Sequence, residues 1–128
     1  DVFVVVTSGD GASPVYRAAA PLPAEGDVAL ERVADLQFGQ PPLAGNASTT
    51  GGDISPSGDA IIIRTYSHAY LWRRAPGQSV AEALATEPCP LPRTQDRQGE
   101  AVGFAADGGG YYTVSEGLGP PVYFFERR

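Results

Sequence analysis

The stretch that decides the fold runs Thr50-Gly51-Gly52-Asp53-Ile54-Ser55-Pro56-Ser57-Gly58-Asp59-Ala60-Ile61-Ile62-Ile63-Arg64-Thr65-Tyr66-Ser67-His68-Ala69-Tyr70-Leu71-Trp72-Arg73-Arg74. This pattern predicts three short strands joined by tight turns. Its centre, Ser57-Gly58-Asp59, is typical of a turn, because Gly accepts a positive φ and Ser and Asp bond their own backbone. The next run, Ile61-Ile62-Ile63, is β-branched and apolar on both faces. It therefore indicates a strand that is covered on both sides.

The composition favours an all-β chain. The 16 Gly and 12 Pro make 28 of 128 residues, well above the usual total of about 12%. A Gly and Pro content this high, without a short sequence repeat and combined with strand-like runs, indicates many turns. A length of 128 residues fits one domain. The net charge of −6 argues against non-specific binding to nucleic acid, and no run approaches the roughly 18 apolar residues that span a bilayer.

Weaker copies of the central stretch recur about 50 residues apart. Ser55-Pro56-Ser57-Gly58-Asp59 parallels Ala105-Ala106-Asp107-Gly108-Gly109, fifty residues on. Residues 7–17 align without a gap on residues 114–124. The three landmark tyrosines are spaced by 54 and 53 residues and are Tyr16, Tyr70 and Tyr123. A repeat of this length that holds about four strands is typical of a β-propeller blade.

We therefore predict a β-propeller fragment of about two and a half four-stranded blades. It forms one partial domain over residues 1–128, with part of a blade at 1–38, a blade at 50–92 and part of a blade at 99–128. The alignment puts the first two strands in the second and third places of their blade. A β-sandwich with coincidentally similar turns is the alternative. Outside the strands, Ser79 and Glu82 match a capping box and predict a short helix that runs to Ala85.

A ring cannot close with this chain alone, because propellers need roughly four to eight blades. A lone arc would expose two apolar blade faces. We therefore expect a second polypeptide, or self-association, to supply the remaining blades. The sequence holds no Met, so we also expect that Asp1 is not a translation start.

Several short motifs resemble the second half of a family of bacterial secreted or envelope-associated β-propeller proteins, which are distantly similar to phytase-like propellers. The motifs that carry the resemblance are the stretch at 50–58, Ile63-Arg64-Thr65-Tyr66, Ala69-Tyr70-Leu71-Trp72, Gln98-Gly99-Glu100-Ala101 and Ser115-Glu116-Gly117. The resemblance covers nearly the whole chain. It implies a preceding half that forms the other blades, and an extracellular, periplasmic or envelope location.

Candidate site residues lie near the expected central channel. Asp53 and Glu100 fall at or just before innermost strands, and their carboxylates are hard ligands that suit Ca²⁺. Arg64 would hold a phosphate or a carboxylate in a two-pronged bond, with Tyr66 and Glu116 at equivalent points of neighbouring blades. The alternative for Asp53 and Glu100 is a structural role, in which they bond backbone N–H groups or pair with Arg64.

Three functions follow from these observations. The first is a non-enzymatic scaffold that binds a partner or a small ligand at the channel mouth. The second is a calcium-dependent phosphoesterase of the phytase-like type, in which a metal-bound water attacks phosphorus. The third is a purely structural part of an assembly. No Ser–His–Asp set and no nucleophile elbow can be assembled from the sequence, so catalytic residues stay unknown.

Overall fold

The computed structural model describes residues 1–93 and 98–127. Within these residues the strands form three antiparallel sheets, with the orders β1-β2-β3, β4-β5-β6-β7 and β8-β9-β10. We call them the first, second and third sheets. The elements are β1 (Val2–Val5), β2 (Ala12–Ala18), β3 (Glu31–Gln37), β4 (Thr49–Ile54), β5 (Ala60–Thr65), β6 (Ala69–Arg73), α1 (Val80–Leu84), β7 (Cys89–Pro90), β8 (Gly99–Phe104), β9 (Gly110–Ser115) and β10 (Val122–Glu126).

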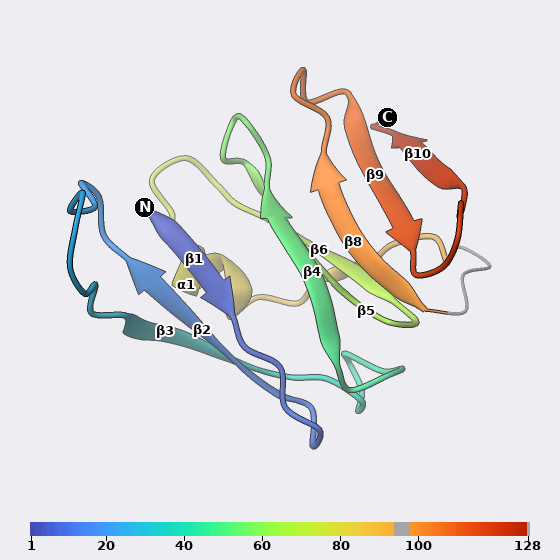
Figure 1. Cartoon of the computed structure of the whole chain (residues 1–128), viewed down its shortest axis with the longest axis horizontal. Helices are drawn as coiled ribbons and strands as arrows, with labels where there is room; N and C mark the ends of the chain where they lie inside the picture. Colours follow the sequence, from blue (N-terminus) through green and yellow to red (C-terminus); the bar gives the residue numbers. More distant parts are fainter. Residues whose placement is uncertain (94–97, 128) are drawn as a thin grey trace.

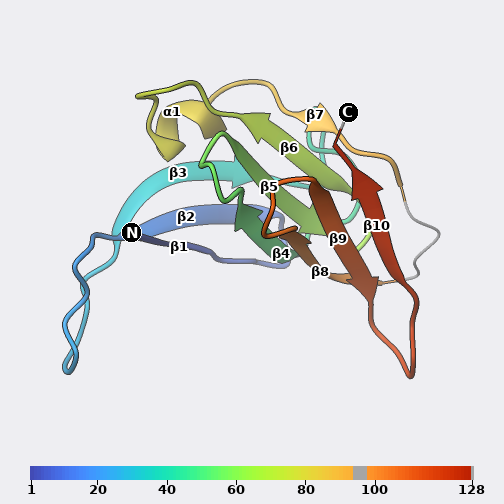
Figure 2. The same cartoon turned by 90° about the horizontal axis from the view of Figure 1, so that it is seen from above.

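The three sheets lie side by side like the leaves of a fan. Figures 1 and 2 show β1, β4 and β8 on the same side of the fan, which we call the inner edge, and β3, β7 and β10 on the opposite side. The helix α1 lies at the outer side, over the first two sheets. Radial packing of consecutive meandering sheets is the arrangement of propeller blades.

The second and third sheets repeat each other at a spacing of 50 residues, as predicted. Ser55 N donates to Ala60 O at 2.9 Å, and Ala105 N donates to Gly110 O at 2.9 Å. Gly58 and Gly108, which close the two turns, have the same φ of +72°, a backbone conformation that favours glycine. The pairing of both inner strands also shifts register at the same place, between Thr49 and Gly51 and between Gly99 and Ala101.

The first sheet corrects the predicted strand alignment. Gly11 N donates to Ser8 O at 3.1 Å, just as Gly58 N donates to Ser55 O at 2.8 Å. The turn after β1 therefore matches the turn after β4, so β1 and β2 occupy the first and second places of their sheet. The predicted second and third places were wrong, because a Gly-rich turn looks alike at either end of a strand.

The hydrophobic core lies between the first and second sheets. Phe38 and Trp72 are almost fully buried there, and Tyr70 packs between their rings. The helix α1 closes this core from outside with Val80, Ala83 and Leu84. Its predicted capping box is present: Glu82 N donates to Ser79 Oγ at 3.1 Å, and Ser79 N donates to Glu82 Oε2 at 2.7 Å. In the described part of the chain, no helix is long and apolar enough to cross a bilayer.

Candidate functional site

The inner strands β4 and β8 lie side by side (Figure 1) and hold the two predicted metal ligands. Asp53 on β4 accepts a bond from Phe104 N of β8 at 2.8 Å and one from Ile54 N at 2.8 Å. The Asp53 carboxylate thus links the second sheet to the third by a hydrogen bond. A carboxylate has about four acceptor positions, so these two bonds leave room for a cation.

Glu100 lies on the neighbouring strand but at some distance from Asp53. It is half-buried on β8, and a Cβ at Gly51 of β4 would come within 3.2 Å of its carbonyl oxygen. Asp53 lies instead beside Gly103, where a Cβ would be 3.6 Å from Asp53 Oδ2. Three residues along a strand span roughly 10 Å. In residues 1–93 and 98–127, no three His, Cys, Asp or Glu side chains gather in a way that would hold a metal ion.

Arg64 lies inside the seam between the second and third sheets. It is 3% exposed, although it belongs to β5. Its Nη1 donates to Thr113 Oγ1 and, at 3.4 Å, to the carbonyl oxygen of Ala101, both in the third sheet. Gly99 makes room for the guanidinium, because a Cβ there would be 1.3 Å from Arg64 Nη2. In this position Arg64 joins two sheets through charge-assisted bonds.

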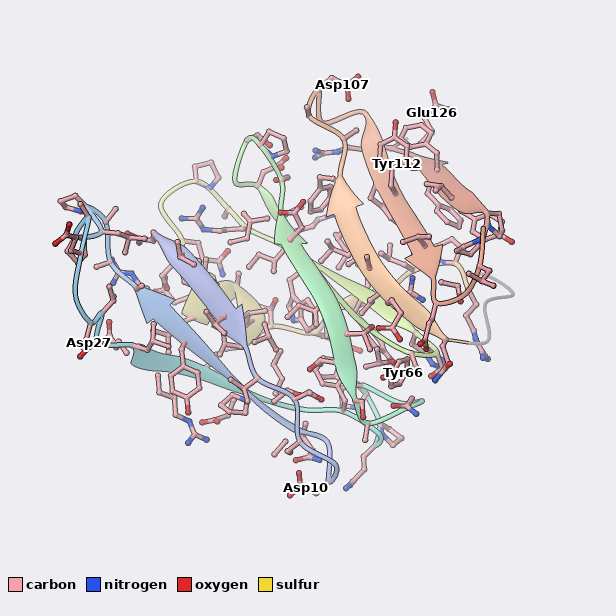
Figure 3. All side chains as sticks on the ribbon, viewed as in Figure 1. Asp10, Asp27, Tyr66, Asp107, Tyr112 and Glu126 are labelled. Carbon is pink, nitrogen blue, oxygen red and sulfur yellow. The ribbon has the colours of Figure 1, made fainter. Side chains whose placement is uncertain are left out.

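Tyr66 and Glu116 lie on either side of the start of β8. Gly99 N donates to Tyr66 O, and Glu116 N donates to Gln98 O, both at 2.9 Å. Figure 3 shows Tyr66 at the opposite end of this strand from Asp107. The structure therefore brings Arg64, Tyr66 and Glu116 to one end of β8, with Glu100 close by along the strand, and places Asp53 near the other end.

Sequence reasoning missed the small residues of this seam. Thr50 Oγ1 donates to Gly99 O at 2.6 Å, and Thr113 accepts from Arg64. No signal in the sequence marks either threonine, since both fit ordinary strand patterns. The position of Arg64 did carry a signal, because it directly follows three buried isoleucines.

The outer part of the same seam is fastened by an ion pair. Arg127 Nη2 lies 2.7 Å from Asp59 Oδ2, so the residue after β10 is tied to the turn before β5. The hydrogen bond from Arg127, followed by those from Ser57 and Ser55, lowers the pKa of Asp59 well below its ordinary value. Beside this pair lies a groove of about 930 Å³, whose lining includes Leu71, Arg73, Tyr111, Phe125 and Glu126.

Comparisons with known proteins support the fold. No family model matches the chain, and no curated protein matches it. Among solved structures, it is similar to the crystal structure of the β-propeller domain of Cps50 (Swd1) from Myceliophteria thermophila, with a TM-score of 0.60 and 12% identity. The match covers 98% of this chain and 37% of that one. At this identity the likeness concerns the fold alone. It confirms the predicted β-propeller fragment over the sandwich alternative.

Proposed function

We propose that this chain is an arc of a β-propeller scaffold, which binds further blades through its two open sheet faces and offers its inner edge to a ligand or a protein partner. The observation that carries the proposal is the apolar character of the outward faces at both ends of the fan. Soluble monomers rarely leave large contiguous apolar patches uncovered, and such patches mark interaction sites.

The open face of the third sheet is aromatic. Tyr112 is 47% exposed and Phe124 is 49% exposed, and their ring centroids lie 4.8 Å apart. Val122, on the same face, is 65% exposed. On the opposite face Tyr111 stacks on Phe125 with centroids 4.9 Å apart and lies toward the second sheet. A sheet that is apolar on both faces is typical of one that packs between two neighbours.

The open face of the first sheet is aliphatic along β1, whereas β3 adds the exposed ion pair of Arg32 and Asp35 to it. Val2, Val4 and Val6 are exposed, whereas Phe3 and Val5, which alternate with them along β1, pack against the core. The strand is thus apolar on both sides, although the chain covers only one of them. We therefore expect a further sheet with an apolar face to pack on each end of the fan.

The occupant that fits these faces is another propeller blade. The chain spans a little over a third of the length of the propeller domain that it matches. Blades pack on each other by apolar sheet faces, and a ring needs roughly four to eight of them. We infer that a second polypeptide or a second copy of this chain supplies blades to one or both faces.

Self-association of the isolated chain tests the proposal. Light scattering over a range of concentrations should give a mass that rises with concentration, and Phe124→Glu should lower that mass, because it buries a charge in the contact. The matched control is Leu22→Glu, since Leu22 is 46% exposed but lies outside both sheet faces. A monomer at every concentration would contradict the supply of blades by a second copy of this chain, and equal effects of the two variants would contradict the use of the open face of the third sheet.

The calcium-dependent phosphoesterase stays a prediction, and so do a bacterial origin and an extracellular or envelope location. No contact in the described residues favours phosphate chemistry over binding. A calcium titration addresses it directly. A rise in melting temperature with calcium, together with a phosphatase activity that Glu100→Gln abolishes, would favour the enzyme over the scaffold.

A further inference from the structure

The third sheet has an open outer edge at the place where the second sheet has a further strand. In the second sheet β7 pairs antiparallel with β6, with Tyr70 opposite Pro90 and Leu71 opposite Cys89. In the third sheet β10 is the outermost strand of the part of the chain that the structure describes. Figure 2 shows β7 beside β6, and β10 at the outer edge of its own sheet. An edge strand presents a row of backbone groups to which a further strand can add.

The bonds between β10 and β9 decide which backbone groups point toward this edge. Arg127 N donates to Gly109 O at 2.9 Å, and from there β10 pairs with β9 without a register shift. Because bonded and non-bonded pairs alternate in an antiparallel ladder, every second residue of β10 turns its N–H and C=O groups away from β9. The residues that do so are Val122, Phe124 and Glu126.

The equivalent residues of β6 bind β7 in the second sheet. Arg74 N donates to Asp59 O at 2.8 Å, which is the counterpart of the bond at the end of β10. By the same alternation, the outward residues of β6 are Ala69, Leu71 and Arg73. Leu91 N, just after β7, donates to Ala69 O at 3.0 Å. A strand that copies this pairing on β10 therefore has a defined direction and a defined register.

The charge at the end of this edge differs between the two sheets. Arg73 of β6 and Glu126 of β10 occupy equivalent places in their ladders, and both are exposed. Continuing the register of β6 and β7 by two residues puts Glu87 opposite Arg73. Opposite charges across a ladder are favourable, and like charges are unfavourable. The strand that fits β10 therefore carries a basic residue at the place that Glu87 has in the second sheet.

The groove of about 930 Å³ described above lies beside this edge. Its lining includes Leu71 and Leu91 from the second sheet and Phe125 from the third. Because side chains alternate along a strand, the added residues opposite Tyr123 and Phe125 would point toward the second sheet, over this groove. In β7 the residue at such a place is Pro90. A proline there offers apolar surface and has no N–H group with which to bind another strand on its far side.

We propose that the outer edge of β10 binds an extended strand of a partner polypeptide, antiparallel to β10, with a basic residue opposite Glu126 and apolar residues opposite Phe124 and Val122. The inference rests on the proposed function, in which a partner supplies further blades, but it concerns the edge of the third sheet and not its open face. In recognition by strand addition, backbone bonds give affinity and alternate side chains give specificity.

The test attaches such a strand to the full chain, so that its effective concentration is high. A Gly-Ser linker after Arg128, which makes the connection as long as that between β6 and β7, ends in Arg-Pro-Val-Pro-Leu, which we call the basic strand. Amide hydrogen exchange at Phe124 should slow about tenfold or more. Exchange at Tyr123 and Phe125, whose N–H groups already bond to β9, should change little. Unchanged exchange at Phe124, or equal slowing at all three residues, would overturn the proposal.

A charge exchange tests the register. The acidic strand, Glu-Pro-Val-Pro-Leu on the same linker, should slow exchange at Phe124 severalfold less than the basic strand, because its first residue lies opposite Glu126. In the background of Glu126→Arg the order of the two strands should reverse. The same order in both backgrounds would refute the register. If Phe124 stays unprotected while the mass of the unfused chain still rises with concentration, the added strand is refuted and the scaffold is not.

Discussion

The substitution Gly99→Ala probes the buried contact between Arg64 and the third sheet. A Cβ at Gly99 would lie 1.3 Å from Arg64 Nη2 and 1.9 Å from Cζ, which no small adjustment relieves. Gly99 does not have a positive φ, so alanine itself suits the backbone. The guanidinium must therefore leave its position, and it loses its bonds to Thr113 Oγ1 and to Ala101 O.

The expected cost follows from those two bonds. A hydrogen bond from a charged donor contributes about 1.5 to 3 kcal/mol to stability. The bond to Ala101 is long, and replacing glycine by alanine returns about 0.4 to 1 kcal/mol through the unfolded chain. We expect Gly99→Ala to lower the free energy of unfolding by about 2 to 5 kcal/mol, a large part of the total for a domain of this size.

Urea unfolding, followed by tryptophan fluorescence at fixed protein concentration, measures this cost. The matched control is Gly103→Ala on the same strand, where the nearest atom to the new Cβ is 3.6 Å away. A double-mutant cycle with Arg64→Ala isolates the clash, because Gly99→Ala should cost less than about 1 kcal/mol once the guanidinium is absent. A cost below about 0.5 kcal/mol, or the same cost in both backgrounds, would refute this account of the seam.

Further predictions concern the helix and the titrating groups. Ser79→Ala should cost about 1 kcal/mol, since the capping box is complete, and an unchanged urea midpoint would contradict this. Hydrogen bonds, first that from Arg127, lower the pKa of Asp59; the stability this gives is present above the unfolded carboxyl pKa and is lost on acidification. Between pH 6 and pH 3, about the ordinary carboxyl pKa of roughly 4, the melting temperature of Asp59→Asn should therefore fall less than that of wild type. Burial, and then the charge of Arg93, lower the pKa of His68 from its ordinary 6.5. The stability of the fold should therefore fall as the pH drops through that value. An NMR titration midpoint of His68 at or above 6.5 would contradict this prediction.

The sequence was sufficient for the blade repeat and the helix, because both rest on local chemistry. Turn glycines with a positive φ and a capping box are set by neighbouring residues. The place of β1 in its sheet was not predictable, since it depends on which edge of a hairpin faces the axis. Turn composition carries no information on that choice.

The candidate site was less accessible to sequence reasoning for a similar reason. The sequence identified Asp53 and Arg64 as candidate site residues. In the structure each of them forms hydrogen bonds between the second and third sheets. What a carboxylate or a guanidinium contacts depends on the neighbouring sheet, fifty residues away in the sequence. The space at Gly99 and the hydroxyl of Thr113 become meaningful only when the two sheets are placed together.

The fan has one seam built on apolar packing and one fastened by an ion pair and buried polar bonds. Apolar packing weakens on cooling, and salt screens an exposed pair such as Asp59 and Arg127. Cooling should therefore weaken the packing of the first sheet against the second before that of the third sheet. A high sodium chloride concentration should favour the reverse order. Amide hydrogen exchange at low temperature and at high sodium chloride would show which of the two outer sheets loses its protection first under each condition. We expect the two conditions to give opposite orders within this one short polypeptide.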